Sequence, residues 1–375
     1  MNPYDFARID WSRPPERRKP IWHHRFVGAE GQKLYSGHMD IDIYAETPIF
    51  IADPRNASPD PRRPAQSMQN KQGEYIIPGS SLKGMLRSVV ETLGNGCLTL
   101  FDAEYERGKV DYDRMVPDEF QHCSTNIHLC IACRMFGMLK HRTSGIFLGK
   151  INIGDARSYA EKVYKYDPMY TAVLVESKPH HEDFYLDQAK KHIAGRKYYF
   201  HHAQDAELHS APGPINFGGK PANRYIQPLD YDTKFHVRID FTNLEPDEFA
   251  AFVLAVVLEE NMRHKIGYGK PLGLGSIYLV PTQLTLIDYA ARYAKSDTAR
   301  EPSVFKEKDM WDLLNEYIDA FSRQERLQIL AMEDLRRIWR WPADTDVDYY
   351  YPSKRDWFDT PESRGKRIAD TRNTP

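Results

Sequence analysis

Three of the four cysteines fall within one short segment, where their spacing could hold a metal ion. Cys130 and Cys133 form a C-x-x-C pair, and Cys123 lies shortly before them. Three thiolates and one further ligand make a tetrahedral zinc site, and clustered cysteines in a chain with too few of them for a disulfide scaffold indicate metal. The candidates for the fourth ligand are His122, His128 and the more distant Cys97, and our candidate set pairs the three cysteines with His122. The alternative is that these cysteines are small core residues.

Such an ion would be structural, because the segment around residues 94–136 is polar and has little apolar content with which to fold alone.

A second group of residues could bind an anion. The stretch YIIPGSSLKGMLRSVVE predicts a short strand, a Pro-Gly turn and an amphipathic helix that Ser80 or Ser81 can cap. Lys83 and Arg87 lie one turn apart, where like charges repel by about 0.2–0.5 kcal/mol, and Gly84 costs about 1 kcal/mol relative to alanine. A phosphate near the helix start would explain these features. The alternative is a solvated basic face.

A glycine-rich stretch, HKIGYGKPLGLGS, has a related composition. Its glycines, Gly267 and Gly269 among them, expose backbone amides and permit close approach by a polyanion. Lys265 and Lys270 add positive charge, and Tyr268 offers a stacking face. The stretch is neither a Walker loop nor a dinucleotide fingerprint, because no GK is followed by Ser or Thr and no helix opens there. Nucleotide-hydrolysing and hydride-transferring enzymes are therefore disfavoured, while a tight turn into a strand explains the glycines equally well.

Composition restricts the protein class. The chain has 375 residues, 41% of them hydrophobic and 28% charged, with a formal net charge of −2. These values are typical of a globular protein of one large or two modest domains, in which a nucleic-acid surface must be a local patch. Apolar runs such as FAAFVLAVVL are too short to span a bilayer, and the amino terminus has no apolar signal core. We therefore expect a cytoplasmic protein that does not contact a membrane.

The elements that must position these residues predict an α+β fold. HMDIDIYAETPIFI begins as an alternating strand, KFHVRIDFTNL is another, and PDEFAAFVLAVVLEENM predicts a buried helix opened by Pro246. The order strand, helix, strand, then strand, helix, strand is the ferredoxin-like split β-α-β plan. We expect one domain over residues 1–300 with a zinc insert near 94–136 and a hairpin insertion between 176 and 232. A helical extension and aromatic tail would follow over 301–375.

Four of these stretches together resemble a known family. YIIPGSSLKGMLRSVVE, LCIACRMFG, GKINIGDA and HKIGYGKPLGLGSIYL occur in this order and are similar to successive motifs of the repeat-associated mysterious protein (RAMP) superfamily, the backbone subunits of type III CRISPR effectors. The resemblance runs from about residue 35 to residue 287. GRKYYFHHA and the closing DYYYPSKRDWFDTPESRGKR look most similar to units of the type III-D and III-E groups.

The resemblance implies an RNA-recognition-motif-like core that binds guide RNA and stacks beside other type III effector subunits. It also implies pairing of the guide with a complementary target RNA, and a zinc-stabilised insert at the position of the cysteines. The residues that it would place on guide phosphates are Ser80, Ser81, Lys83, Arg87, Gly267, Gly269 and Lys270.

Cleavage of the target RNA is a further implication. Many family members cut with an acidic residue in the loop before the IPGSSLKG helix, where this chain offers Asp53 and Asp60, of which Asp60 lies nearer the usual position. A carboxylate there could hold hydrated Mg²⁺ or Mn²⁺, or orient a ribose hydroxyl for in-line attack. The alternatives are a solvated turn residue, a structural subunit that does not cut, and a zinc-stabilised RNA-binding protein outside CRISPR.

Three histidines, His201, His202 and His209, could supply a general acid near neutral pH, as in metal-free RNA cleavage. The alternative for these residues is an ordinary surface loop.

Overall fold

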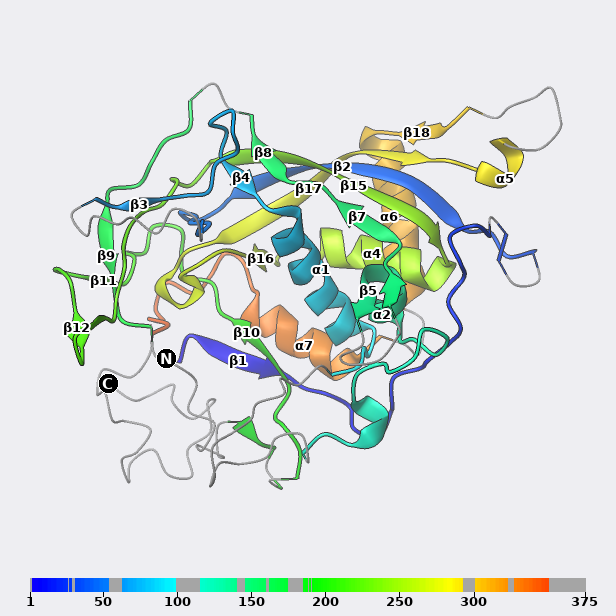
Figure 1. Ribbon diagram of the computed structural model, residues 1–375, viewed down its shortest axis with the longest axis horizontal. Coiled ribbons are helices and arrows are strands. Elements are labelled where there is room, and N and C mark those ends of the chain that lie inside the picture. The colour runs from blue at the N-terminus through cyan, green and yellow to red at the C-terminus, as the bar shows by residue number, and fades with distance from the viewer. Residues whose placement is uncertain are drawn as a thin grey trace.

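An eight-stranded sheet forms the frame of the protein (Figure 1). The computed structural model describes residues 2–25, 27–28, 31–53, 63–98, 115–139, 146–159, 162–174, 185–187, 189, 191–292, 301–322 and 327–350. The strand order is β16 (His264–Lys265), β17 (Ser276–Leu286), β2 (Tyr35–Ala45), β15 (Lys234–Leu244), β8 (Ala156–Ser158) and β4 (Ile76–Ile77). In addition, β18 (Ser303–Phe305) pairs with β17, and β7 (Ile151–Ile153) pairs with β15. All these pairings are antiparallel.

Alternating side chains decide which face of this sheet is covered. Along β15 the apolar residues Phe235, Val237 and Ile239 are buried, and the polar residues between them are exposed. On the open face, Arg238 donates two hydrogen bonds to Asp40 of β2, at 2.8 and 3.0 Å. This is the pattern of an antiparallel sheet with one face in solvent.

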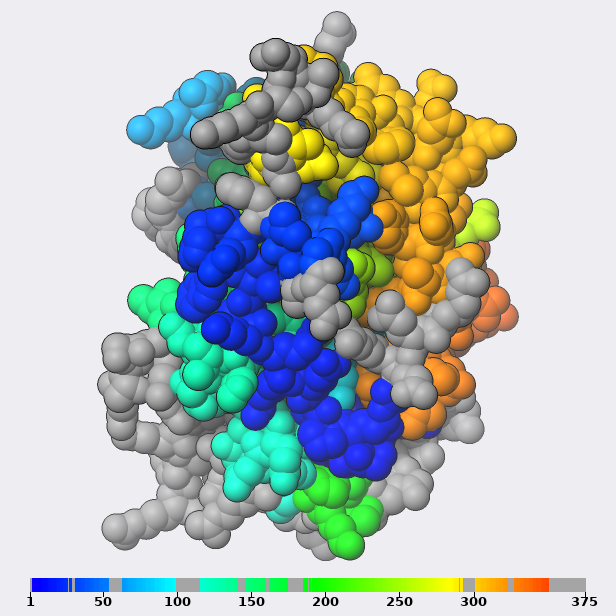
Figure 2. Space-filling model, turned by 90° about the vertical axis from the view of Figure 1, so that its right-hand side faces the viewer, coloured from blue at the N-terminus to red at the C-terminus, as the bar shows by residue number. Residues whose placement is uncertain are grey.

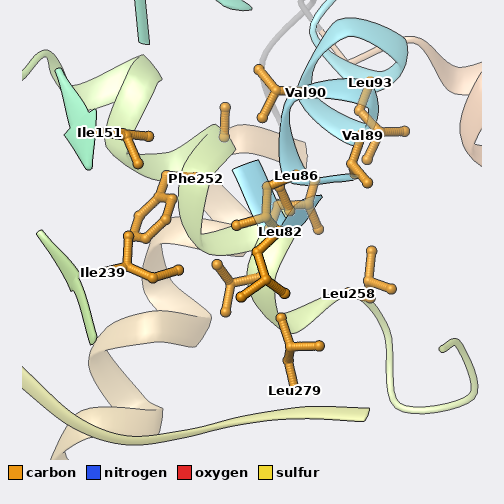
Figure 3. Close-up of a cluster of buried hydrophobic side chains, with 14 of the residues drawn as sticks. Leu82, Leu86, Val89, Val90, Leu93, Ile151, Ile239, Phe252, Leu258 and Leu279 are labelled. Carbon is orange, nitrogen blue, oxygen red and sulfur yellow. The ribbon is translucent and has the colours of Figure 1, made fainter. Parts of the chain in front are cut away.

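Helices cover the other face (Figure 1). They are α1 (Gly79–Leu93), α2 (Ile131–Phe136), α4 (Pro246–Val257), α6 (Glu307–Ser322) and α7 (Ile329–Ile338), while α5 (Tyr289–Arg292) is a single turn near β18. Leu82 and Leu86 of α1 lie in one buried cluster with Ile239 of β15 and Phe252 of α4 (Figure 3). No helix in the described part of the chain is both long and apolar enough to cross a membrane.

Smaller sheets surround this core. They are β1 (Tyr4–Ala7) with β10 (Arg196–Tyr199); β11 (Ser210–Ala211), β9 (Met169–Thr171), β14 (Tyr225–Gln227) and β3 (Ala65–Gln66); β12 (Asn216–Phe217) with β13 (Lys220–Pro221); and β5 (Gly137–Leu139) with β6 (Ile146–Leu148). Two 3₁₀ turns, η4 (Asp118–Phe120) and η5 (Lys270–Leu272), complete the regular structure that is described. After β1, the amino-terminal arm lies beside the segment at 115–139 (Figure 2), where Arg17 donates to the carbonyls of Glu119 and Gln121.

The predicted mixture of helices and strands is confirmed. The strands predicted in HMDIDIYAETPIFI and KFHVRIDFTNL are present as β2 and β15, and Pro246 opens α4 as expected. The amino-terminal strand β1 was not predicted, because its four residues have too little periodicity to distinguish them from a loop. The proposed division of domains at residue 300 stays a prediction, and α6 and α7 bury Leu314 and Leu335 in the same hydrophobic core as α1 and α4.

A buried ion network ties the segments beside the sheet together. The Glu248 carboxylate of α4 accepts from Arg134 Nε of α2 at 2.6 Å and from Lys150 Nζ at 2.7 Å, and all three side chains are at most 1% exposed. It also accepts from the Glu245 amide, which completes a capping box at the start of α4. Although burial favours the neutral acid, the two cations hold the pKa of Glu248 below its ordinary value.

Removing this carboxylate should destabilise the fold. We expect Glu248→Ala to lower the free energy of unfolding by about 3–5 kcal/mol, because two buried cations lose their counter-charge. Urea denaturation followed by circular dichroism measures this. The control is Glu333→Ala, which removes a half-exposed pair with Arg8 at 3.5 Å and should cost about 1 kcal/mol or less. Equal effects of the two substitutions would contradict the prediction.

Candidate functional site

A groove of about 600 Å³ lies between α1, β10 and the glycine-rich segment that joins β16 to β17. The groove is lined by residues from far apart in the chain: Ile51, Ala52, Ser81, Gly84, Met85, Ser88, Lys197, Tyr198, Tyr199, Lys265, Ile266, Gly267, Tyr268, Lys270 and Trp339. Small and hydroxyl side chains come from α1, and cations and aromatic rings come from the opposite walls. The fold thus brings together the two stretches that the sequence indicated as anion-binding.

The glycines of the segment are required by its backbone. Gly267, Gly269 and Gly275 have φ angles of +85°, +74° and +80°, which favour glycine. A side chain at Gly275 would place its Cβ 1.9 Å from the carbonyl oxygen of Ile266. The Tyr268 amide donates to the Phe50 carbonyl at 2.9 Å, so it is used within the chain. The glycines therefore shape a tight turn, and that turn carries Lys270 to the groove.

Three lysines of the groove are partly or fully desolvated. Burial lowers the pKa of Lys265 to about 7 and that of Lys197 to about 8, and it also lowers the pKa of Lys270. Lys265 Nζ donates to Ser276 Oγ at 3.3 Å, and Lys270 Nζ donates to the Gly267 carbonyl at 2.9 Å. In the described part of the chain none of the three forms an ion pair with a carboxylate.

Aromatic rings lie beside these cations. Lys197 Nζ lies 3.7 Å from the ring centroid of Tyr4 and 4.9 Å from that of Tyr199. Tyr268, from the glycine-rich segment, has the Arg224 guanidinium 5.0 Å from its ring centroid. Cations and rings in one groove match the two surfaces of a single-stranded nucleic acid, its phosphates and its base faces.

Gly84 of α1 faces this groove. A Cβ added at Gly84 would meet no atom within 4 Å, so a larger side chain there would extend into open space. Gly84 therefore lowers helix stability but leaves this part of the groove free of side-chain atoms.

The start of α1 differs from the prediction. Neither Ser80 nor Ser81 caps the helix, which begins at Gly79 after Pro78, and both serines are exposed in its first turn. The Asp155 carboxylate instead accepts from the Gly79 amide at 2.9 Å. The anion at this helix start is therefore supplied by the chain itself. Asp155 belongs to the GKINIGDA stretch, and only the fold brings it to the helix.

The two cations of α1 have partners within the protein. Lys83 Nζ donates to the Ile151 carbonyl at 2.8 Å. Arg87 donates from Nε to Glu91 at 2.7 Å and from Nη1 to the Gly137 carbonyl at 2.8 Å. Although burial opposes its charge, the contact with Glu91 raises the pKa of Arg87. Neither cation lines the groove. Phosphate contact by Lys83 and Arg87 stays a prediction, and both side chains already hold parts of the fold together.

The groove also contains residues that the sequence did not indicate. Lys197, Tyr199 and Ser88 line it. The adjacent aromatic residues in RKYYF were a weak signal for the strand β10, but its pairing with β1 could not be seen from the sequence.

The four cysteines meet in one buried cluster. The Sγ atoms of Cys97, Cys123, Cys130 and Cys133 all lie within 4.8 Å of one another. Cys97 Sγ and Cys133 Sγ are 3.7 Å apart. Sulfur atoms at about 2.3 Å from a tetrahedral zinc ion are about 3.8 Å from each other, so the cluster fits zinc.

Other contacts suit thiolate ligands. The Cys97 amide donates to Cys130 Sγ at 3.4 Å, and the Cys130 amide donates to Cys123 Sγ at 3.2 Å. The fourth member of the cluster is Cys97, whereas His122 and His128 are exposed and lie outside it. Our choice of His122 is therefore corrected. Cys97 is remote in sequence, and the proximity of a histidine to the C-x-x-C pair was misleading.

The remaining candidates have different surroundings. Asp53 is buried and follows Ala52, which lines the groove, whereas Asp60 lies outside the described residues. His201 Nδ1 lies 2.8 Å from Ser276 Oγ, and burial lowers the pKa of this imidazole well below its ordinary value. Burial also lowers the pKa of His202, to about 2. These two histidines are therefore neutral near pH 7 and are poor general acids.

We expect purified protein to contain about one zinc ion per chain. Cys97→Ser should release the metal as readily as Cys130→Ser, because both sulfur atoms belong to the cluster. His122→Ala should retain the metal. Metal analysis and thermal denaturation of the three variants measure this. Metal loss from the His122→Ala variant together with its retention by the Cys97→Ser variant would restore the histidine as ligand.

Comparison with known proteins identifies the family of the chain. The family model of the RAMP superfamily matches residues 42–278, which include β15, α4, the cysteine cluster and all but one of the groove residues. No curated protein matches the chain. Since the match covers more than half of the chain, the protein belongs to the RAMP superfamily.

Proposed function

We propose that this chain binds the guide RNA of a type III CRISPR effector in the groove between α1 and the glycine-rich segment. Membership of the RAMP superfamily implies a CRISPR-associated subunit that works with guide RNA in a ribonucleoprotein complex. The observation that carries the proposal is the group of desolvated lysines, Lys197, Lys265 and Lys270, which face the groove without a carboxylate partner in the described chain.

The electrostatic argument favours a polyanion. Burying an ammonium group costs free energy unless an opposite charge or hydrogen bonds replace its water. In this groove the replacement is one hydroxyl for Lys265 and one carbonyl for Lys270. A phosphate placed between them would favour the charged form of both side chains and would release the counterions of the RNA. Lys197 would add a third contact from the opposite wall.

The fold supports the same proposal. Taking β2, α1, β7, β15, α4 and β17 in chain order, the four strands lie side by side as β17, β2, β15 and β7, with antiparallel neighbours. This order supports the proposal that the chain has a ferredoxin-like or RNA-recognition-motif-like core. The groove would then follow the side of that core where α1 meets the segment before β17.

The remaining parts of the hypothesis come from the family resemblance. We propose that a complementary target RNA pairs with the bound guide, that other type III subunits adjoin this one, and that zinc is held by the cysteine cluster. Cleavage through Asp60 or Asp53 with Mg²⁺ or Mn²⁺ stays a prediction from the sequence.

Substitutions at Gly84 test the groove without removing a charge. Gly84→Ala should stabilise the protein by up to about 1 kcal/mol, because the new methyl group meets no atom and alanine favours the helix. Gly84→Leu should place a larger side chain in the groove and weaken the binding of single-stranded RNA by at least about tenfold, a loss of about 1.4 kcal/mol. Thermal unfolding and fluorescence anisotropy measure the two effects. Wild-type affinity in a folded Gly84→Leu variant would place the RNA elsewhere.

The binding of RNA should depend on pH near neutrality. A phosphate favours the ammonium form, so binding raises the pKa values of Lys265 and Lys197 from about 7 and about 8. The contribution of the two lysines is therefore complete below pH 7, begins to fall as the pH passes about 7 for Lys265 and about 8 for Lys197, and is fully lost above the raised pKa values of the RNA-bound state. We expect the dissociation constant to increase by about tenfold or more between pH 6.5 and 8.5, at up to about tenfold per pH unit for each lysine.

Lys197→Arg serves as the matched variant for this measurement. Because arginine stays charged in this range, the part of the pH dependence near pH 8 should disappear while binding at pH 6.5 is retained. Calorimetry in buffers of different ionisation enthalpy should show proton uptake on binding. A dissociation constant that does not change with pH would contradict a role for these lysines.

A further inference from the structure

Three side chains connect the cysteine cluster to two walls of the groove. Arg87 and Glu91 are on α1, and Arg196 is on β10. Arg87 Nε donates to Glu91 Oε1 at 2.7 Å, and Arg196 Nη1 pairs with Glu91 Oε2 at 3.4 Å. All three are largely removed from solvent, with side chains 28%, 16% and 14% exposed in the order Arg87, Glu91, Arg196, so solvent screens their charges only in part. We call this set the Arg-Glu-Arg bridge.

Both ends of the bridge reach metal-ligand segments. Arg87 Nη2 donates to Cys133 Sγ at 3.5 Å. Arg196 Nη2 donates to the carbonyl of Cys97 at 2.9 Å and to that of Gly96 at 2.8 Å. The two cysteines are 36 positions apart in the chain, and the bridge contacts one through its sulfur atom and the other through its backbone.

The same three residues belong to the elements that form the groove. On α1, Gly84 lies about one turn before Arg87 and Ser88 lies directly after it, and both residues line the groove. On β10, Arg196 immediately precedes Lys197, which lines the groove. A displacement of either arginine therefore shifts a wall of the groove directly.

We propose that Arg87, Glu91 and Arg196 are positioning residues through which metal binding at the four cysteines and RNA binding in the groove favour each other. This inference rests on the proposed function.

The charge of the metal site explains the direction of the coupling. Four thiolates around a divalent ion have a net charge of about −2, and the Arg87 guanidinium beside Cys133 stabilises that charge. When the ion leaves, the four cysteines are no longer held together, and the segments around Cys133 and Cys97, which Arg87 and Arg196 contact, lose their cross-link. The bridge is then anchored less firmly, and the walls that carry Ser88 and Lys197 are free to separate.

Thermodynamic linkage makes the effect reciprocal. If zinc raises the affinity for RNA by a certain factor, RNA must raise the affinity for zinc by the same factor. Coupling between two sites in a protein typically amounts to about 5–150-fold. A cluster that only prevented unfolding would show no such dependence once the protein is folded.

The experiment measures the zinc affinity of the whole chain in the absence and in the presence of RNA. Zinc affinity is obtained by competition with a chromophoric chelator, with and without a single-stranded RNA oligonucleotide, in wild type and in Glu91→Gln. We expect RNA to increase the zinc affinity of wild type by about tenfold, and that of Glu91→Gln by less than about threefold, with about one zinc still bound per chain. The control is Arg238→Gln, which removes the pair of Arg238 with Asp40 on the open face of the sheet, far from the bridge. RNA should increase the zinc affinity of this variant as much as it does that of wild type.

A spectroscopic measurement covers the case in which a metal-free variant does not fold. In cobalt-substituted protein, the sulfur-to-cobalt charge-transfer band reports the surroundings of Cys133. RNA should shift this band in wild type but not in Arg87→Lys, because lysine has no planar fork to contact Cys133, Glu91 and Gly137 together.

Two results would overturn the coupling and leave the proposed function intact. The first is RNA that binds tightly without changing the zinc affinity or the cobalt band. The second is a Glu91→Gln variant in which RNA increases the zinc affinity as much as in wild type. A folded, zinc-loaded protein that does not bind RNA at all would overturn the proposed function and the coupling with it. The two failures are therefore distinguishable.

Discussion

The buried carboxylate of Glu248 is the constraint on which the rest of the arrangement depends. It holds Arg134, next to the cysteine pair, and Lys150, next to β7, against the start of α4. Because a buried charge without its counter-charge is costly, the three segments are stable only in one relative position. Lys83 and Asp155 then attach α1 to the strand region that follows Lys150. The position of the groove therefore depends on charged side chains that do not line it.

The elements with strong local patterns could be predicted from the sequence. Alternation over eleven residues specifies β15, and the apolar stripe of α1 fixes which side of that helix is buried, as Leu82 and Leu86 show. Local pattern also indicated that Gly267 and Lys270 belong near an anion, and the fold brings both to the groove. These features depend on neighbours within a few residues, and such neighbours can be identified in the sequence.

What could not be predicted depends on contacts between distant segments. Lys83 and Arg87 are on the polar side of α1, but whether a polar side faces solvent, a ligand or a backbone carbonyl depends on what packs there. Cys97 was one of three candidates for the fourth ligand until folding placed its sulfur atom 3.7 Å from that of Cys133. Lys197 lies on a strand that exists because β1, almost two hundred residues earlier, pairs with it. No local periodicity contains this information.

The composition of the groove also has a consequence for the order of events in the cell. Its lining extends from Ile51 to Trp339, so no shorter stretch of chain contains all of its walls. Ribosomes add about 5–20 residues per second, and an emerging chain therefore passes many seconds with an α1 but without the strand, lysines and tryptophan that face it. A chain still being translated contains only part of the groove. RNA that binds in the proposed groove can therefore meet all of its walls only after Trp339 has been translated, so the position of this residue in the chain sets the earliest time of assembly.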